Sequence, residues 1–221
     1  MRLGMFMMPV HPPGRPMSET LAEDTAKSVL ADKLGYDELW MGEHFSATTE
    51  PFPSPLMFLA GLVPQTKNLT FGTAVINLPN HHPAIVAAEC AQFDHMSGGR
   101  FLMGVGSGGL ASDFELFNID PAARQRQFME SIDMIQHIWA QDPPYDITGE
   151  FWNVQIRKAI MPVAIALSMI VEMTSWTPRV VLSRAAIEAH IAPKRMATTT
   201  AMMTHSHTPG MLLSFRLVLE G

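Results

Sequence analysis

Glu43 and His44 are two ionisable side chains that stand together where a buried strand is predicted to end. They follow the apolar residues 39–41 and a single glycine, Gly42. In parallel α/β proteins the loops after the carboxyl ends of the strands carry the reacting groups, and the strands hold these loops in place. An imidazole has an ordinary pKa of about 6.5 and exchanges a proton readily at neutral pH. The pair is therefore a candidate acid–base site, although a solvated loop or a helix start would also accommodate it.

Polar residues follow the other predicted strands as well. They are His11 after the first strand, Asn77 with His81 and His82 after the third, and the glycine-rich residues 106–109 with Asp113 after the fourth. The strand ends of a parallel sheet meet at one edge, so these residues and the Glu43–His44 pair should converge on one rim. His81 and His82 are adjacent and precede Pro83, so they lack the i, i+4 spacing of a zinc-binding helix. We therefore expect no metal site.

The elements that would position these residues alternate along the chain. Apolar runs bounded by turn residues predict strands, and apolar residues at helical spacing between capping residues predict helices. The predicted strands cover residues 3–10, 39–41, 69–76 and 100–106, and the predicted helices cover residues 18–34, 52–63, 84–96 and 121–139. The apolar residues of the first helix that share one face are Leu21, Ala22, Ala26, Val29, Leu30 and Leu34.

This alternation predicts an α/β fold with a parallel sheet and right-handed crossovers. About four strand–helix units fit into about 140 residues, which is the spacing of the first half of a TIM (β/α)8 barrel of typically about 250 residues. A doubly wound open sheet is the alternative, and hydrophobic periodicity does not separate the two. The convergence of the polar residues on one rim favours a barrel, of which only the N-terminal half to five-eighths is expected.

Residues 104–109 match the pattern G-x-G-x-x-G after a predicted strand, so a dinucleotide-binding site must be considered. The fingerprint requires a helix that begins at the third glycine and a strand-ending acid about 20 residues further on. Residues 110–120 show no helical stripe, and no such acid follows. We therefore discount a Rossmann site. Asp113 next to Ser112 is a candidate site residue or, alternatively, a helix N-cap.

Composition and charge exclude several classes of protein. The chain has 221 residues, 47% of them hydrophobic, and a net charge of −6 without a run of Lys or Arg, which argues against binding to nucleic acid or to an anionic membrane. Cys90 has no second cysteine to pair with, as is usual in a reducing compartment. The longest apolar run, residues 159–171, is shorter than the about 20 residues of a membrane span, and no secretory signal is recognised. A cytoplasmic protein is expected.

Three stretches carry a resemblance to a known family: LGYDELWMGEHF, the run from LTFGTAVINLPNHH to RFLMGVGSGG, and SDFELFNIDPAARQRQFMESIDMI. Over about residues 1–160 the chain resembles the bacterial luciferase-like family of flavin-dependent monooxygenases, and most of all its limonene monooxygenase-type branch. The resemblance implies a (β/α)8 barrel, a homodimer paired through the second and third helices, and reduced FMN bound at the carboxyl-terminal rim. It also implies that a separate flavin reductase supplies the FMNH2, and that one atom of O2 enters an organic substrate while the other leaves as water.

The resemblance assigns roles to particular residues. His44 lies where the family has its active-site histidine, and Asp113 lies at the matching acidic position, where it would orient or charge-stabilise the imidazole. Independently of the resemblance, the sequence leads us to expect that Glu43 supports the rim or pairs with Arg100.

The cofactor-binding residues are also implied by the resemblance. A non-proline cis peptide is expected at Ala74–Val75, under the flavin ring, and the Asn77 amide would face the polar edge of the flavin. The family's backbone approaches the flavin at the positions of Gly106, Ser107 and Gly108. Bacterial luciferase itself has a cysteine and an arginine in place of the first two, so light emission and its phosphate contact are not carried over.

The last quarter of the chain has a different composition. From residue 161 onward Asp is absent, Gly occurs only at positions 210 and 221, and Met and Thr accumulate. Residues 163–168 resemble the family's fifth strand, and a helix over residues 183–191 is possible by pattern. We expect residues 1–160 to form the luciferase-like half-barrel and residues 161–221 to be an atypical segment, either truncated or frame-altered sequence or a short form completed by another subunit.

Three functions are consistent with the sequence. The first is an FMNH2-dependent monooxygenase that acts on a small apolar compound of the terpene or aldehyde type, since Met7, Met8, Trp40 and Phe45 would form an apolar wall. The second is a deazaflavin (F420)-dependent dehydrogenase of the same fold. The third is an inactive half-barrel remnant that binds neither cofactor.

Overall fold

The computed structural model describes residues 2–50, 52–158 and 180–182. The helices are α1 Met17–Lys33, α2 Pro55–Leu62, α3 Pro83–Ser97, α4 Ala111–Phe117 and α5 Arg124–Ala140, with short 3-10 turns η1 Val63–Gln65 and η2 Leu78–Asn80. The strands are β1 Gly4–Met7, β2 Glu38–Met41, β3 Thr70–Thr73, β4 Ile76–Asn77, β5 Phe101–Gly106, β6 Tyr145–Thr148, β7 Asn153–Ile156 and β8 Val180–Leu182. This confirms the predicted alternation of strands and helices.

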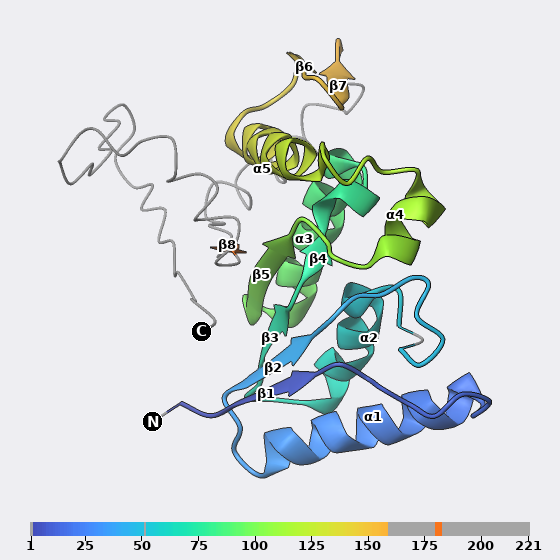
Figure 1. The fold of residues 1–221 in the computed structure, drawn as a ribbon. Helices are drawn as coiled ribbons and strands as arrows, with labels where there is room; N and C mark the ends of the chain where they lie inside the picture. Colours follow the sequence, from blue (N-terminus) through green and yellow to red (C-terminus); the bar gives the residue numbers. More distant parts are fainter. Residues whose placement is uncertain (1, 51, 159–179, 183–221) are drawn as a thin grey trace, which may run out of the picture.

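The main sheet is parallel and has the order β1-β2-β3-β5-β4, with β8 also paired to β5 (Figure 1). Consecutive strands are neighbours, as in a barrel, and Met7, Met41 and Thr73 lie in register at the carboxyl ends of β1, β2 and β3. The helices follow in the same order, since α1 packs against α2, α2 against α3 and α3 against α5. The described residues therefore form part of a (β/α)8 barrel, and the sheet does not close within them.

The core lies between the strands and this helical layer. Its fully buried side chains include Leu39, Leu59, Phe71 and Phe128. Phe93 of α3 packs edge-on against Phe71 of β3, with ring centroids 5.9 Å apart. These contacts fix the helices on the strands and leave the loops at the carboxyl ends of the strands to form the rim.

Local signals define the helix ends. Ser54 caps α2 by accepting a hydrogen bond from the Met57 N–H, at 3.3 Å, and Pro55 occupies the first helical position, where no N–H is needed. Helix α3 also begins with a proline, Pro83, and ends at Gly98, whose φ of 66° is the left-handed conformation that glycine tolerates.

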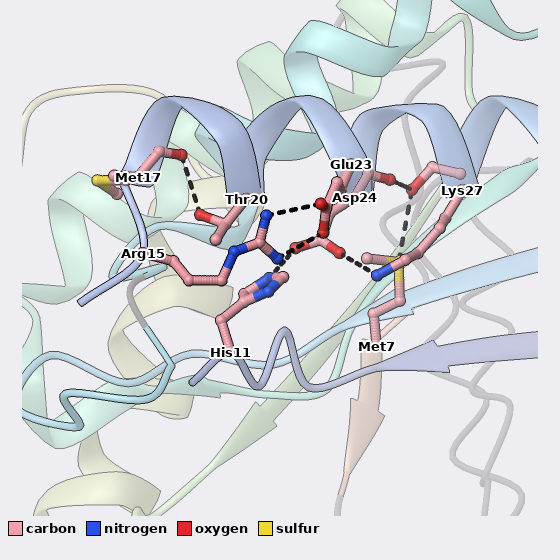
Figure 2. A network of polar contacts seen from close by, with 9 residues as sticks. Met7, His11, Arg15, Met17, Thr20, Glu23, Asp24 and Lys27 are labelled. Atoms are coloured by element: carbon pink, nitrogen blue, oxygen red, sulfur yellow. Dashed lines mark hydrogen bonds and ion pairs between the residues drawn. The ribbon is translucent and has the colours of Figure 1, made fainter. Parts of the chain in front are cut away.

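Helix α1 buries only part of the apolar face that its sequence pattern suggested, since Leu21 and Val29 pack partly buried against the core. Its buried face includes the polar residues at four-residue spacing, Thr20, Asp24, Ser28 and Asp32, whereas Leu30 and Leu34 are exposed. The reason is that these polar side chains have partners inside the fold. Ser28 Oγ donates to the Asp24 carbonyl at 2.7 Å. The Asp24 carboxylate contacts His11 Nε2 and accepts a hydrogen bond from Lys27 Nζ (Figure 2).

Two local predictions were wrong in detail, and one element was not foreseen. The third strand is interrupted at residues 74–75 and continues as β4, and the Ala74–Val75 peptide between the two parts is cis. A helix, α4, forms in the stretch for which none was expected. The antiparallel hairpin β6–β7 was not predicted. Glu130 of α5 anchors this hairpin by accepting the N–H groups of residues 150–152.

Beyond residue 158 the structure describes only β8, which lies parallel to β5 with Met103 opposite Val180. The predicted fifth strand at residues 163–168 and the helix at residues 183–191 lie outside the described residues. The division of the chain at residue 160 stays a prediction.

Candidate active site

The loops that follow β1, β2, β4 and β5 form one rim, as the sequence predicted for its polar residues. Ser46, two residues after His44, joins the loop after β2 to helix α4. The Ser46 backbone N–H donates to Asp113 Oδ1 at 2.9 Å, and its hydroxyl donates to the same oxygen. The Ser46 hydroxyl also lies 2.7 Å from Ser112 Oγ. These contacts fix the buried Asp113 carboxylate next to the segment that carries His44.

His44 lies between two carboxylates. Its Nε2 is 3.1 Å from Glu50 Oε2, and its Nδ1 is 3.7 Å from Asp113 Oδ2. Among the described residues neither His44 Nδ1 nor Glu50 Oε2 makes a hydrogen bond of acceptable geometry, although both atoms are buried. The two distances therefore describe close approaches and not formed hydrogen bonds. Such contacts commonly tighten only when a ligand is bound.

Glu43 is buried and faces away from His44. Its Oε1 accepts the Asn77 backbone N–H at 3.1 Å and the Asn77 side-chain amide at 3.2 Å, and its Oε2 lies 2.9 Å from His81 Nε2. The suggested pairing of Glu43 with Arg100 is wrong. The Arg100 guanidinium lies under Phe71 and donates to the carbonyl groups of Leu69 and Val63, because residue 100 precedes β5 and so lies at the opposite end of the sheet.

The predicted cis peptide at Ala74–Val75 is confirmed. The Ala74 N–H donates to the Met41 carbonyl at 2.7 Å, which places this peptide beside the end of β2. Gly106 of β5 lies opposite it, and a Cβ atom at Gly106 would meet Val75 Cγ2 at 2.6 Å. A side chain at position 106 is therefore excluded, and the backbone is left bare at this point of the rim.

Gly108 continues the bare backbone with a φ of +77°, and a Cβ atom there would lie 3.1 Å from Phe114 Cε1. Ser107, between the two glycines, is partly exposed. The Asn77 amide group donates to Glu43, so it is the Asn77 amide oxygen that lies towards these glycines.

Asp113 is not a helix N-cap. Helix α4 begins at Ala111, its N-cap position is Leu110, and Asp113 lies inside the first turn with its carboxylate turned to Ser46. A helix thus does follow the glycine loop, and the absence of one was an incorrect reason to discount a Rossmann site. The rim geometry and the barrel order of the strands now exclude that site on firmer grounds.

Three further residues of the rim were missed by sequence reasoning. Glu50 and Ser46 lie in the loop after β2, where Glu50 approaches His44 and Ser46 donates a hydrogen bond to Asp113. Arg124, at the start of α5, places its guanidinium 5.7 Å from the centroid of the Phe114 ring, and an edge atom of the same ring would lie 3.1 Å from a Cβ atom at Gly108. The Arg124 Nε is buried without a hydrogen-bond partner among the described residues. These single residues form no sequence motif, so only their positions in the folded chain identify them.

Within the described ranges no group of three or more His, Cys, Asp or Glu side chains is arranged to hold a metal ion. No helix of the described part is both long and apolar enough to cross a membrane.

The partial barrel and its rim are features of a defined class of α/β proteins, and comparison with known proteins identifies it. The chain matches the luciferase-like monooxygenase family over residues 1–181 and belongs to that family. It is 41% identical over 141 residues to 4-hydroxyprotoasukamycin monooxygenase of Streptomyces nodosus subsp. asukaensis, a match that covers 64% of this chain and 38% of the relative. It is 36% identical over 137 residues to limonene 1,2-monooxygenase of Rhodococcus erythropolis, a match that covers 62% of this chain and 35% of the relative. The resemblance seen in the sequence is thereby confirmed.

Solved structures share the fold. The oxygenating constituent of 3,6-diketocamphane monooxygenase from Pseudomonas putida, in complex with FMN, superposes with a TM-score of 0.75 at 24% identity, covering 83% of this chain and 51% of that one. An F420-dependent secondary alcohol dehydrogenase superposes with a TM-score of 0.64 at 18% identity, covering 82% of this chain and 52% of that one. The chain thus spans between about a third and a half of the length of the proteins it matches.

Proposed function

We propose that this chain carries the flavin and oxygen site of a monooxygenase that uses reduced FMN and O2 to insert one oxygen atom into a small apolar substrate. The observation that carries the proposal is the position of His44, between Glu50 and Asp113 on the same rim as the cis Ala74–Val75 peptide. Curated relatives at 41% and 36% identity are named as monooxygenases, which supports the same reaction class.

The rim residues fit a flavin. The isoalloxazine is flat and largely apolar, and the bare backbone at Gly106 and Gly108 next to Val75 provides a surface on which a flat ring can lie. The residues proposed to contact it are Ala74, Val75, Asn77, Gly106, Ser107 and Gly108. Arg124 is proposed to meet the FMN phosphate, since its guanidinium lies over Phe114, the ring beside Gly108, and retains a donor without a partner in the described part.

Reduced FMN, when bound, would supply the electrons that activate dioxygen. In our proposal His44 donates and accepts the protons that this chemistry requires, because its ring lies partly exposed at the rim. Asp113 is proposed to balance the positive charge of the ring when it is doubly protonated, and Ser46 holds Asp113 for that task. Phe45 packs edge-on against Phe117 with ring centroids 4.8 Å apart, and this pair would exclude water from one side of the site.

The proposed partners follow from the relatives. The diketocamphane protein is described as an oxygenating constituent, which supports a separate flavin reductase as the source of FMNH2 for this chain too. A homodimer through α2 and α3 is proposed because Met57, Ile85 and Met96 on these helices are exposed. The substrate is proposed to be of the terpene or aldehyde type. Its apolar wall would include Met8 and Phe45.

The test is incorporation of labelled oxygen. The purified protein is mixed with photoreduced FMN, ¹⁸O2 and either limonene or decanal, and the products are analysed by mass spectrometry. We expect one labelled atom in the product, and we expect His44→Ala to lower product formation by a factor of roughly 100 or more, the usual loss when a general acid–base residue is removed. His137→Ala is the matched control, because His137 is exposed on α5. Equal labelling by the two variants would exclude His44 from the chemistry.

An F420-dependent dehydrogenase is the second candidate, favoured by the fold shared with the F420-dependent alcohol dehydrogenase. Anaerobic titration of the protein with reduced FMN and with F420, followed by fluorescence, separates the two functions. Binding of FMN alone supports the monooxygenase, and binding of F420 alone would replace it by the dehydrogenase. Binding of neither cofactor would support the inactive remnant.

A further inference from the structure

A second carboxylate approaches His44 in addition to Asp113. Glu50 lies further along the same loop after β2, and its Oε2 is the nearer of the two acids, at 3.1 Å from His44 Nε2. Asp113 Oδ2 stands at 3.7 Å from the other ring nitrogen, Nδ1. In the described part of the chain these are the two charged groups that approach the ring, since the Glu43 carboxylate is taken up by Asn77 and His81.

The two carboxylates compete for one proton. A neutral imidazole carries a hydrogen on a single nitrogen, and the hydrogen-bond partner of the ring decides which nitrogen that is. Neither approach has the geometry of a formed hydrogen bond, but Glu50 is the nearer negative charge, so the proton of a neutral ring would be drawn to Nε2. The buried Nδ1 atom, on the Asp113 side of the ring, would then keep its lone pair and would take up the second proton when the ring becomes doubly protonated. The Asp113 carboxylate would face the N–H that results.

The main chain around Glu50 is fixed by several hydrogen bonds. The Glu50 N–H donates to the Ala47 carbonyl at 3.2 Å, and the Phe52 N–H donates to the Glu50 carbonyl at 2.9 Å. The residue before Glu50 is tied to a different loop, because the Thr49 carbonyl accepts the His11 backbone N–H at 2.7 Å. The position of Glu50 therefore depends on His11, at the end of β1.

His11 is itself held by a buried carboxylate of helix α1. Its Nε2 lies 2.6 Å from Asp24 Oδ2, and the two side chains are 7% and 2% exposed (Figure 2). Lys27, one turn further along α1, contributes a hydrogen bond of 3.0 Å to Asp24 Oδ1. A buried pair of this kind, once formed, resists movement, because either partner left alone would be buried without compensation.

We propose that Glu50 is a positioning residue for His44, which holds the ring proton on Nε2 and leaves Nδ1 to exchange protons, and that the His11–Asp24 pair holds the segment that carries Glu50. This inference rests on the acid–base role proposed above for His44. It gives a structural role to Glu50, His11 and Asp24, three buried or half-buried groups that take no direct part in the proposed reaction.

The test reads the tautomer of His44 directly, in protein without flavin or substrate. The chain is labelled with ¹⁵N-histidine, and long-range ¹H–¹⁵N spectra are recorded at a pH at which the ring is neutral. The spectrum of His44→Gln identifies the signals of His44 among the nine histidines. In the wild-type protein we expect Nε2 to resonate as a protonated nitrogen and Nδ1 as an unprotonated one.

Two variants of Glu50 separate positioning from mere support of the loop. Glu50→Leu removes the acceptor and should transfer the ring proton to Nδ1, whereas Glu50→Gln retains an acceptor oxygen and should keep the wild-type pattern. Glu115→Leu is the control, because Glu115 is exposed on α4. A wild-type ring with its proton on Nδ1, or an unchanged pattern in Glu50→Leu, overturns the proposal. The wild-type result is decisive even where Glu50→Leu does not fold.

A third variant tests the support beneath the loop. We expect His11→Gln to give a mixture of the two His44 tautomers, since Glu50 would no longer be held in one place. An unchanged tautomer in His11→Gln overturns the role of the His11–Asp24 pair. In turnover assays we expect Glu50→Leu to lower kcat roughly tenfold with little change in KM. Failure of the monooxygenase assay would leave the spectra interpretable, so the two proposals fail separately.

Discussion

At the rim, glycines that leave the backbone uncovered lie near charged side chains. Gly106 and Gly108 have neighbours that exclude a larger side chain, whereas Asp113 is held by Ser46. The histidine that was expected from the sequence, His44, does lie near Asp113. Its nearer acid, Glu50, was not expected, because no spacing rule connects a loop acid to a histidine in the same loop.

The buried Cys90 leads to a prediction about reactivity. Burial in α3 raises the pKa of the Cys90 thiol, with smaller contributions from the charges of Glu89 and Asp94. The thiolate is the reactive form, so native protein should react very slowly with a thiol reagent such as DTNB at pH 8. Protein unfolded in urea should react at the rate of a free cysteine. Rapid reaction of the native protein would show that Cys90 is accessible.

Gly104 in β5 is predicted to be intolerant of any side chain. A Cβ atom there would overlap the Thr73 carbonyl oxygen, a backbone atom that cannot move aside without breaking the β3–β5 pairing. We expect Gly104→Ala to lower the free energy of unfolding by about 3 kcal/mol, as overpacking in a core does. The measurement is urea denaturation. Gly109→Ala is the control, since nothing lies within 4 Å of a Cβ atom at that position, and equal losses in the two variants would contradict the argument.

At the scale of elements, helix α1 connects distant parts of the chain through its polar face. Asp24 meets the loop after β1, and Asp32 accepts the backbone N–H groups of residues 67, 68 and 69, ahead of β3, at 3.1, 2.8 and 3.0 Å. The apolar pattern correctly indicated that a helix forms here. It indicated the buried face only in part, because the hydrophobicity of the residues does not show which polar side chains will find partners inside the fold.

Asp32 should make stability dependent on pH. Burial opposes its ionisation, but the three backbone N–H groups and the charge of Arg100 outweigh burial and place the pKa of Asp32 below its usual range. A depressed pKa in the folded state stabilises the protein above the unfolded value of about 3.9, and this contribution is lost as the pH falls through the folded value. We expect Asp32→Ala to cost on the order of 3 kcal/mol at pH 7, because buried N–H groups lose their acceptor.

The measurement for Asp32 is urea unfolding of the wild-type protein and of Asp32→Ala between pH 7 and pH 3. The difference between the two should begin to shrink below about pH 4, where Asp32 of the unfolded chain takes up a proton, and should shrink further as the pH approaches the lowered pKa of the folded carboxyl. Asp133→Ala, at an exposed position of α5, controls for the loss of an aspartate from a helix. A difference that stays constant with pH would mean that the charge of Asp32 does not contribute.

At the scale of the whole molecule, the described sheet has an edge at β1. Leu3, Phe6 and Val10 in and beside this strand are exposed, at 46%, 55% and 60%. A strand edge with exposed apolar side chains pairs readily with other chains. Leu30 of α1 and Leu34, the residue after α1, are also exposed.

We predict that the β1 edge makes the chain self-associate as its concentration rises. Phe6→Lys should raise the concentration at which association begins, because a lysine on an edge strand opposes pairing. Light scattering at increasing protein concentration measures the effect. Leu116→Lys, which removes an exposed leucine from helix α4 and not from a strand edge, should have little effect. An equal response of both variants would assign the association to general hydrophobicity.

The sequence by itself determined the order of strands and helices, the parallel sheet, the family and the positions of His44, Asp113 and the glycine loop. These depend on local periodicity, on turn residues and on contiguous motifs, all of which can be recognised from residues that are close together in the sequence. The tertiary structure alone decided which face of α1 is buried, that Glu43 binds Asn77 and His81, and that Glu50 stands next to His44. The contacts of Glu43 and of α1 join segments that are distant in sequence, and the Glu50 contact depends on the path of a single loop, so no local pattern in the sequence predicts them.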